Sequence, residues 1–153
     1  MNVSSLETLG NVFAEALCDV ISVISGFSLN MKPCESGNNL DAVTGAMILD
    51  GAERGLIFIS AEEDSVKTLC SYMTGVPESE VEKEDVYDAM CEVVNMTVGN
   101  AKLRLNDVDY MFRFFSPFII SGKDISVIPK KRVLFTSRAL SCDRVSVNLK
   151  IMY

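Results

Sequence analysis

The sequence predicts an α+β domain with a mainly antiparallel sheet and helices packed on one face. Apolar residues recur at helical spacing near the start of the chain and again in its middle, and the segments that follow alternate at the two-residue period of strands. The chain has 153 residues, the size of one domain, and its hydrophobic content of 48% is ordinary for a globular protein. We therefore expect a single domain over residues 1–153.

The N-terminal segment predicts a helix. Ser4 followed by Glu7 has the spacing of a capping box, in which two side chains cap the first turn. Apolar residues recur through residues 6–24, and Gly26 has the position of a C-terminal cap. Residues 31–39 predict a loop or an irregular edge strand.

A hairpin and a second helix are expected next. Residues 40–49 and 56–60 have strand patterns, and the Asp-Gly pair and second glycine of residues 50–55 favour a turn between them. Residues 62–73 predict a helix with acids in its first turn, and Gly75 follows its end.

Residues 80–105 predict the longest helix. It begins with acidic residues and ends with Lys102 and Arg104, the charge order that the helix dipole favours. Strand patterns follow at residues 110–115, 118–120, 132–138 and 145–151. Alternation places the aromatic residues of this region on both sheet faces, so we expect them in the core or in a dimer interface: Phe112, Phe114, Phe115 and Phe118.

The composition excludes several functions. Histidine is absent, which excludes Ser-His-Asp and Cys-His catalysis, histidine phosphotransfer and most zinc chemistry. The net charge of −7 argues against nucleic-acid binding. Three aspartates that could suggest a cation site lack calcium-loop spacing, so we expect no metal site: Asp64, Asp107 and Asp109.

The chain has the features of a cytoplasmic protein. Its five cysteines form no Cys-x-x-Cys pair, which is typical of free thiols in a reducing compartment. No basic residue precedes Lys32, and acidic residues interrupt the first apolar stretch. We therefore expect neither a signal peptide nor a membrane span.

One face of the long helix carries polar residues and a glycine. These residues follow one another at spacings of four, three, four and three: Asp88, Glu92, Asn95, Gly99 and Lys102. At about 100° per residue they fall within an arc of about 80°. The apolar residues lie mostly away from this face and are expected in the core: Val86, Met90, Val93, Val94 and Ala101.

This face suits phosphoryl-transfer chemistry. The carboxamide of Asn95 is no base, but it can hold a water with one donor and one acceptor, and water positioning is a large part of phosphoryl transfer. Glu92 can pair with a lysine of the molecule that carries the phosphate, and Gly99 leaves room for close approach. Surface helices carry similar residues by default, so a merely solvated helix edge is the alternative interpretation.

The helix also carries a family resemblance. Residues 92–102, EVVNMTVGNAK, resemble the Glu-x-x-Asn-x-x-x-Gly-Asn-x-Lys signature of the chemotaxis phosphatase family CheX, whose CheC and FliY relatives share the Glu-x-x-Asn core. Residues 117–122 resemble the Pro-x-x-x-x-Gly strand that follows this helix in CheX-like domains. The resemblance implies a CheC-like fold over nearly the whole chain, with the long helix carrying the motif.

The resemblance implies a phosphatase that acts on a phosphorylated CheY-like receiver domain. Glu92 would pair with the active-site lysine of the receiver, and Asn95 would position the water that attacks the aspartyl-phosphate. We expect Asp88, Gly99 and Lys102 to contact the same partner. The receiver would supply Mg²⁺, and this chain would need no cofactor or metal of its own. A homodimer is also implied, with residues 40–49 or 145–151 offering a sheet edge.

Two questions stay open. CheC-type relatives carry a second Glu-x-x-Asn on the first helix, whereas here Glu15 is followed by Cys18, so we expect one active site per chain. The alternative function is a non-catalytic CheX-like module that binds a receiver or dimerises. The resemblance names neither the receiver nor the pathway, which could be chemotaxis or another two-component system.

Overall fold

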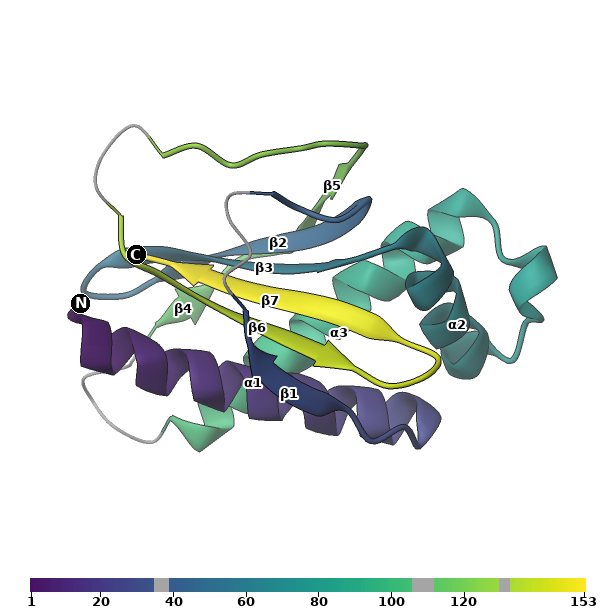
Figure 1. Cartoon of the computed structure of the whole chain (residues 1–153), viewed down its shortest axis with the longest axis horizontal. Helices are drawn as coiled ribbons and strands as arrows, with labels where there is room; N and C mark the ends of the chain where they lie inside the picture. Colours follow the sequence, from purple (N-terminus) through teal and green to yellow (C-terminus); the bar gives the residue numbers. More distant parts are fainter. Residues whose placement is uncertain (35–38, 106–111, 130–132) are drawn as a thin grey trace.

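The computed structural model describes residues 1–34, 39–105, 112–129 and 133–153. In these ranges a seven-stranded sheet carries its helices on one face, which confirms the α+β prediction (Figure 1). The helices are α1 (Val3–Ser25), α2 (Glu63–Thr74) and α3 (Lys83–Arg104), with a short 3₁₀ turn at Glu78–Glu80. α1 and α3 pack on the sheet and on each other, and α2 packs against both helices.

The sheet pairs its strands antiparallel throughout. The strand order is β1-β6-β7-β3-β2-β4, and β5 also pairs with β2. The strands are β1 (Asn30–Pro33), β2 (Val43–Asp50), β3 (Arg54–Ala61), β4 (Arg113–Phe114), β5 (Phe118–Ser121), β6 (Phe135–Ser141) and β7 (Ser146–Met152). The β2–β3 hairpin and the edge strand β1 were both expected from the sequence.

The two strands expected at a sheet edge lie inside the sheet instead. β7 lies between β6 and β3, and β2 lies between β3 and the β4–β5 side. The prediction that residues 145–151 or 40–49 offer a sheet edge was therefore wrong. A strand pattern in the sequence shows which side chains are buried, but it does not show how many strands pair with that strand. In the described residues the edges are β1 on one side and β4 with β5 on the other.

The helix starts also differ from the sequence pattern. Asn2, and not Ser4, caps α1, and its side chain accepts a hydrogen bond from the Ser5 amide at 2.8 Å. α3 begins only at Lys83, after a capping box made by Glu82 and Asp85. The expected ends hold, because Gly26 and Gly75 both adopt the left-handed conformation with φ of 74° and 76°.

Among the later strands β4 is shorter than expected, whereas β6 and β7 keep the expected length but lie slightly farther along the chain. Some predictions fall outside the described residues. β4 covers only two residues of the expected 110–115, of which 110 and 111 are not described, and β6 begins at Phe135, after the undescribed residue 132. Residues 35–38 of the expected loop are likewise outside the description, as are Asp107 and Asp109.

The main core lies between the sheet and the helices. Its largest buried side chains come from all three helices and from the central strands, and include Phe13, Leu17, Met47, Leu49, Ile57, Ile59, Leu69, Met90 and Leu149. A smaller apolar cluster covers the opposite sheet face, where Ala46, Phe58 and Met152 are buried against Leu40. α1 has the length and apolar composition of a membrane span, although the sequence pattern led us to expect none. Here it buries its apolar face in this core.

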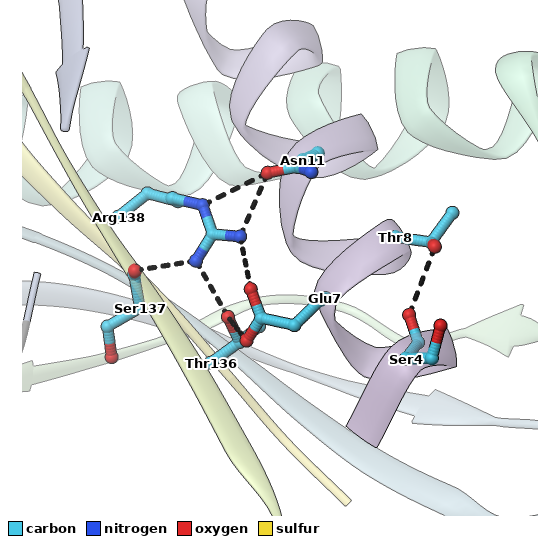
Figure 2. A network of polar contacts seen from close by, with 7 residues as sticks. All are labelled: Ser4, Glu7, Thr8, Asn11, Thr136, Ser137 and Arg138. Atoms are coloured by element: carbon cyan, nitrogen blue, oxygen red, sulfur yellow. Dashed lines mark hydrogen bonds and ion pairs between the residues drawn. The ribbon is translucent and has the colours of Figure 1, made fainter. Parts of the chain in front are cut away.

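A partly buried polar network fixes α1 to β6 (Figure 2). The Arg138 guanidinium donates to Glu7 at 2.6 Å, to the Asn11 side chain at 2.8 Å and to the Thr136 hydroxyl at 2.8 Å. Thr136 in turn donates to Glu7 at 2.8 Å. Close packing requires Gly10, because a Cβ there would lie 2.6 Å from the Thr136 methyl group. Glu7 therefore joins α1 to the sheet and does not form the capping box expected from the sequence.

Candidate functional site

The buried face of α3 fixes the orientation of the helix. Every apolar residue that the sequence assigned to the core is buried: Val86, Met90, Val93, Val94 and Ala101. Gly45 of β2 allows α3 to approach the sheet, since a Cβ there would lie 2.5 Å from Val94 Cγ2. Because one side of the helix is committed to the core, the opposite side must face solvent.

That opposite side carries the predicted polar face. Asp88, Glu92, Asn95 and Lys102 are exposed, and Gly99 is half-buried. A Cβ built on Gly99 would meet nothing within 4 Å, so the surface beside it is open. Within the described part of the chain, the side chains of Glu92 and Asn95 have no hydrogen-bond or ion-pair partner. The structure thus brings these residues to one accessible ridge, while their roles stay predictions.

The ridge runs beside the β4–β5 edge of the sheet, a neighbourhood that the sequence did not reveal. Tyr87 of α3 shares a 2.8 Å hydrogen bond with Ser121 of β5, and this bond lowers the pKa of the Tyr87 phenol. Farther along α3, the Lys102 ammonium lies 5.3 Å from the centre of the Phe114 ring on β4. These contacts join residues 12 or more positions apart, which local spacing does not encode.

The aromatic residues near this edge divide between core and surface. Phe112 is buried and stacks on Phe13 at a centroid distance of 6.0 Å, as expected for a core residue. Phe114, Phe115 and Phe118 are instead exposed, so the core alternative was wrong for these three, and the dimer-interface alternative stays a prediction. Phe114 on β4 and Phe118 on β5 lie at the sheet edge, where a neighbouring strand is absent on one side within the described residues, and Phe115 follows β4.

The first helix offers no equivalent ridge at its Glu-x-x-Cys sequence. Arg104 of α3 donates to the Glu15 carboxylate at 3.3 Å and forms an ion pair with Asp19. Cys18 is half-buried, and burial raises the pKa of its thiol. An acid engaged by arginine is not available to a partner in the way that Glu92 is.

Cys18, Cys70, Cys91 and Cys142 are free thiols, as the sequence predicted. Burial raises the pKa of the Cys70 and Cys91 thiols, which lowers their reactivity. In residues 1–34, 39–105, 112–129 and 133–153, no group of three or more acidic, cysteine or histidine side chains is arranged to hold a metal ion.

The fold defines a CheC-like α+β protein. A CheC-like superfamily protein from Shewanella sp. PV-4 is 26% identical, with 99% of this chain and 98% of that chain covered and a TM-score of 0.83. Chemotaxis protein CheX from Vibrio vulnificus is 22% identical, with 94% and 97% covered and a TM-score of 0.79. The CheX–CheY–BeF₃–Mg²⁺ complex from Borrelia burgdorferi contains a chain 22% identical, with 92% and 94% covered and a TM-score of 0.76.

The family follows from the sequence match. Residues 43–137 match the family described as chemotaxis phosphatase CheX. This segment is more than half of the chain and contains the whole of α3, so the chain belongs to the CheX family. The resemblance drawn from residues 92–102 is thereby confirmed. No curated protein matches the chain by sequence.

Proposed function

We propose that this protein hydrolyses the aspartyl-phosphate of a CheY-like receiver domain. The observation that carries the proposal is the exposed pair formed by Glu92 and Asn95, one turn apart on α3, with open surface beside Gly99. Membership in a family described as chemotaxis phosphatase supports the same reaction. A ridge of this kind can enter the phosphorylation pocket of another protein, where a concave site could not.

Asn95 is the residue that positions water. Its amide oxygen accepts a hydrogen bond and its amide nitrogen donates one, so a single water can be held in a fixed direction. The water oxygen attacks phosphorus, and the bond from phosphorus to the aspartyl oxygen breaks. Orthophosphate leaves with the two protons of the water, and the receiver regains its aspartate carboxylate. Positioning and charge stabilisation, more than proton transfer by this chain, drive the step.

Glu92 is the residue that engages the receiver lysine. Its exposed carboxylate lies one helical turn before Asn95, so a charge-assisted bond to that lysine would fix the distance between the amide and the phosphoryl group. Asp88 lies one turn earlier and adds negative charge at the same end of the ridge. Together they orient the receiver before the water attacks.

The receiver supplies Mg²⁺, and this chain supplies no cofactor. The B. burgdorferi complex contains CheX, CheY, BeF₃ and Mg²⁺, which supports this division between the two proteins. The cation would neutralise charge on the phosphoryl oxygens while Asn95 acts on the water.

We also propose a cytoplasmic homodimer. The composition and the free cysteines support the compartment. If a second copy pairs by strand addition, the edges available in the described residues are β1 and the β4–β5 side, because the other strands there already have two neighbours. Sedimentation of the purified protein measures the mass directly.

The decisive experiment measures orthophosphate release from a phosphorylated CheY-like receiver. We expect Asn95→Ala to lower kcat by about 10²-fold, since the water loses its orientation. Glu92→Ala should mainly weaken binding of the receiver. Asn30→Ala is the matched control, because Asn30 is an exposed asparagine on β1 at the other side of the sheet.

Two outcomes would contradict the proposal. If the wild type binds the beryllofluoride form of its receiver but releases no phosphate, the protein is the non-catalytic module. If Asn95→Ala retains the wild-type kcat, the amide does not position the water.

A further inference from the structure

The exposed ridge of α3 has a negative end and a positive end. Asp88 and Glu92 lie toward its N-terminal half, and Lys102 lies at its C-terminal end. At about 1.5 Å per residue, Glu92 and Lys102 are separated by about 15 Å along the helix axis. Asn95 and Gly99 lie between them, so the charge changes sign across the proposed catalytic position.

Phe114 supports the positive end from the neighbouring strand. The Lys102 ammonium lies 5.3 Å from the centre of the Phe114 ring, the distance of a cation–π contact. Such a contact restricts a side chain that would otherwise sample many rotamers, so less entropy is lost when a partner binds it. The basic end of the ridge is therefore partly ordered before a partner arrives.

The strand register places Phe114 on the face of the sheet that carries the helices. Phe114 pairs with Leu49, which belongs to the core beneath the helices. Phe118 pairs with Ala46, which belongs to the cluster on the opposite face. Their exposed fractions are nearly equal, 41% for Phe114 and 44% for Phe118. Only Phe114 therefore extends the α3 ridge, and Phe118 provides a natural comparison.

We propose that Lys102 and Phe114 form a second contact region that orients the receiver on α3. This inference rests on the proposed function, since the occupant is the same receiver domain. A protein site that holds Mg²⁺ does so with carboxylates, so the mouth of a receiver's phosphorylation pocket is acidic. The receiver lysine meets Glu92 at one end of the ridge, and the acidic side meets Lys102 at the other. The opposite orientation would place like charges together at both ends.

Continuity with the proposed catalytic position favours a receiver over a second copy of this chain as the occupant. A second copy with its α3 parallel would bring its own Asp88 and Glu92 close to these residues, which repels, whereas an antiparallel copy would pair its Lys102 with them, so the oligomeric state of the variants is measured as well. The contact between Lys102 and Phe114 makes the aromatic surface continuous with the ridge that carries Glu92 and Asn95. The receiver that reaches Asn95 therefore lies against Phe114 as well.

The test compares binding and turnover in four variants of the full chain. The probes are a CheY-like receiver with beryllofluoride and Mg²⁺ for association, and the same receiver phosphorylated for orthophosphate release. We expect Lys102→Met to raise KM about two- to fivefold and to flatten the decrease of the association rate with salt. Lys102→Arg keeps the charge and the stacking, and should restore both properties. Phe114→Ala should raise KM about fivefold.

The value of kcat distinguishes this role from catalysis. All variants should keep kcat within about twofold of wild type, because neither side chain reaches the reacting atoms. Phe118→Ala should leave KM, kcat and salt dependence unchanged, although it removes a ring of similar exposure. Melting temperatures compare the stability of the variants, and Lys102→Met is the variant least able to disturb the core because Lys102 is exposed.

Three results would overturn the inference. If Lys102→Met and Phe114→Ala leave KM and salt dependence unchanged while the wild type releases phosphate, the proposed function stands and this contact region does not. If Phe114→Ala converts a dimer to a monomer without changing KM, a second copy occupies the surface. If the wild type neither binds nor dephosphorylates a receiver, the proposed function fails and the inference fails with it.

Discussion

The guanidinium of Arg138 on β6 donates a 2.6 Å hydrogen bond to the carboxylate of Glu7 on α1, joining residues 131 positions apart (Figure 2). Arg138 is buried, whereas the Glu7 side chain remains 50% exposed. The pair fixes α1 against the sheet, and α1 in turn packs along α3. The position of the proposed catalytic ridge therefore depends partly on a polar contact on the other helix.

Replacing Arg138 should destabilise the fold. Arg138→Met leaves the Asn11 and Thr136 side chains without a buried charged partner, and we expect a loss of about 2–3 kcal/mol in the free energy of unfolding. Urea denaturation at constant m-value measures this loss. Arg144→Met is the control, because the exposed pair of Arg144 with Glu78 should contribute less than about 0.5 kcal/mol. Equal losses in the two variants would contradict the assigned role of the network.

The same contact should make stability depend on acidic pH. The hydrogen bond from Arg138 holds the pKa of Glu7 below its usual 4.5. Because the unfolded chain binds the proton first, the stabilisation from Glu7 is complete above pH 4.5 and is lost as the pH falls through the lowered pKa. Urea midpoints measured across this range should fall less steeply in Glu7→Gln than in the wild type. A variant with the same pH slope as the wild type would show that another group controls acid stability.

Alanine substitution should have opposite effects on stability at Gly99 of α3 and at Gly45 of β2, which faces α3. Gly99 has open space around it, so Gly99→Ala should stabilise the helix by up to about 1 kcal/mol. The added methyl group would occupy the surface that the receiver approaches, so receiver binding should weaken. Gly45→Ala would bring a Cβ to 2.5 Å from Val94 and should destabilise the protein by about 1–3 kcal/mol. Denaturation curves and receiver titrations measure the two effects separately. Unchanged receiver binding in Gly99→Ala would exclude close approach at that position.

The C-terminal tyrosine should limit stability in alkaline solution. Burial raises the pKa of Tyr153 from 10.0 to about 12, and its ring packs on Gly55. The unfolded chain loses this proton at lower pH, so stability is complete below pH 10 and declines as the pH rises toward 12. Ultraviolet titration of the phenolate band should find one late-ionising tyrosine that is missing in Tyr153→Phe. In the same variant the urea midpoint should fall less between pH 10 and 12 than it does in the wild type.

Much of the fold was predictable because its signals are local. The 3.6-residue period of α3 separates Val94 and Met90 from Glu92 and Asn95, and this separation is visible in the sequence without any other part of the chain. The left-handed caps at Gly26 and Gly75 are equally local, since few residues tolerate that backbone conformation. The family resemblance of residues 92–102 also needed only contiguous residues.

The wrong predictions concerned residues whose positions depend on contacts with distant parts of the chain. Glu7 has the spacing of a capping residue, yet a buried arginine on β6 offers a stronger charged bond. Local sequence patterns marked β2 and β7 as strands but could not reveal that both have neighbours on two sides. For the same reason the core placement of Phe114 failed, since the residue lies exposed beside Lys102, while its place in a dimer interface stays a prediction.

The polar and apolar faces of α3 could be read from the amino-acid order, because side-chain periodicity follows from backbone geometry within a few residues. The neighbours of the polar face emerge only in the folded chain, because strand order and register bring together residues that are far apart in sequence. The exposure of Glu92 and Asn95 was predictable in this way from the sequence. The contact between Lys102 and Phe114, which extends their ridge onto the sheet, could be found only in the folded structure.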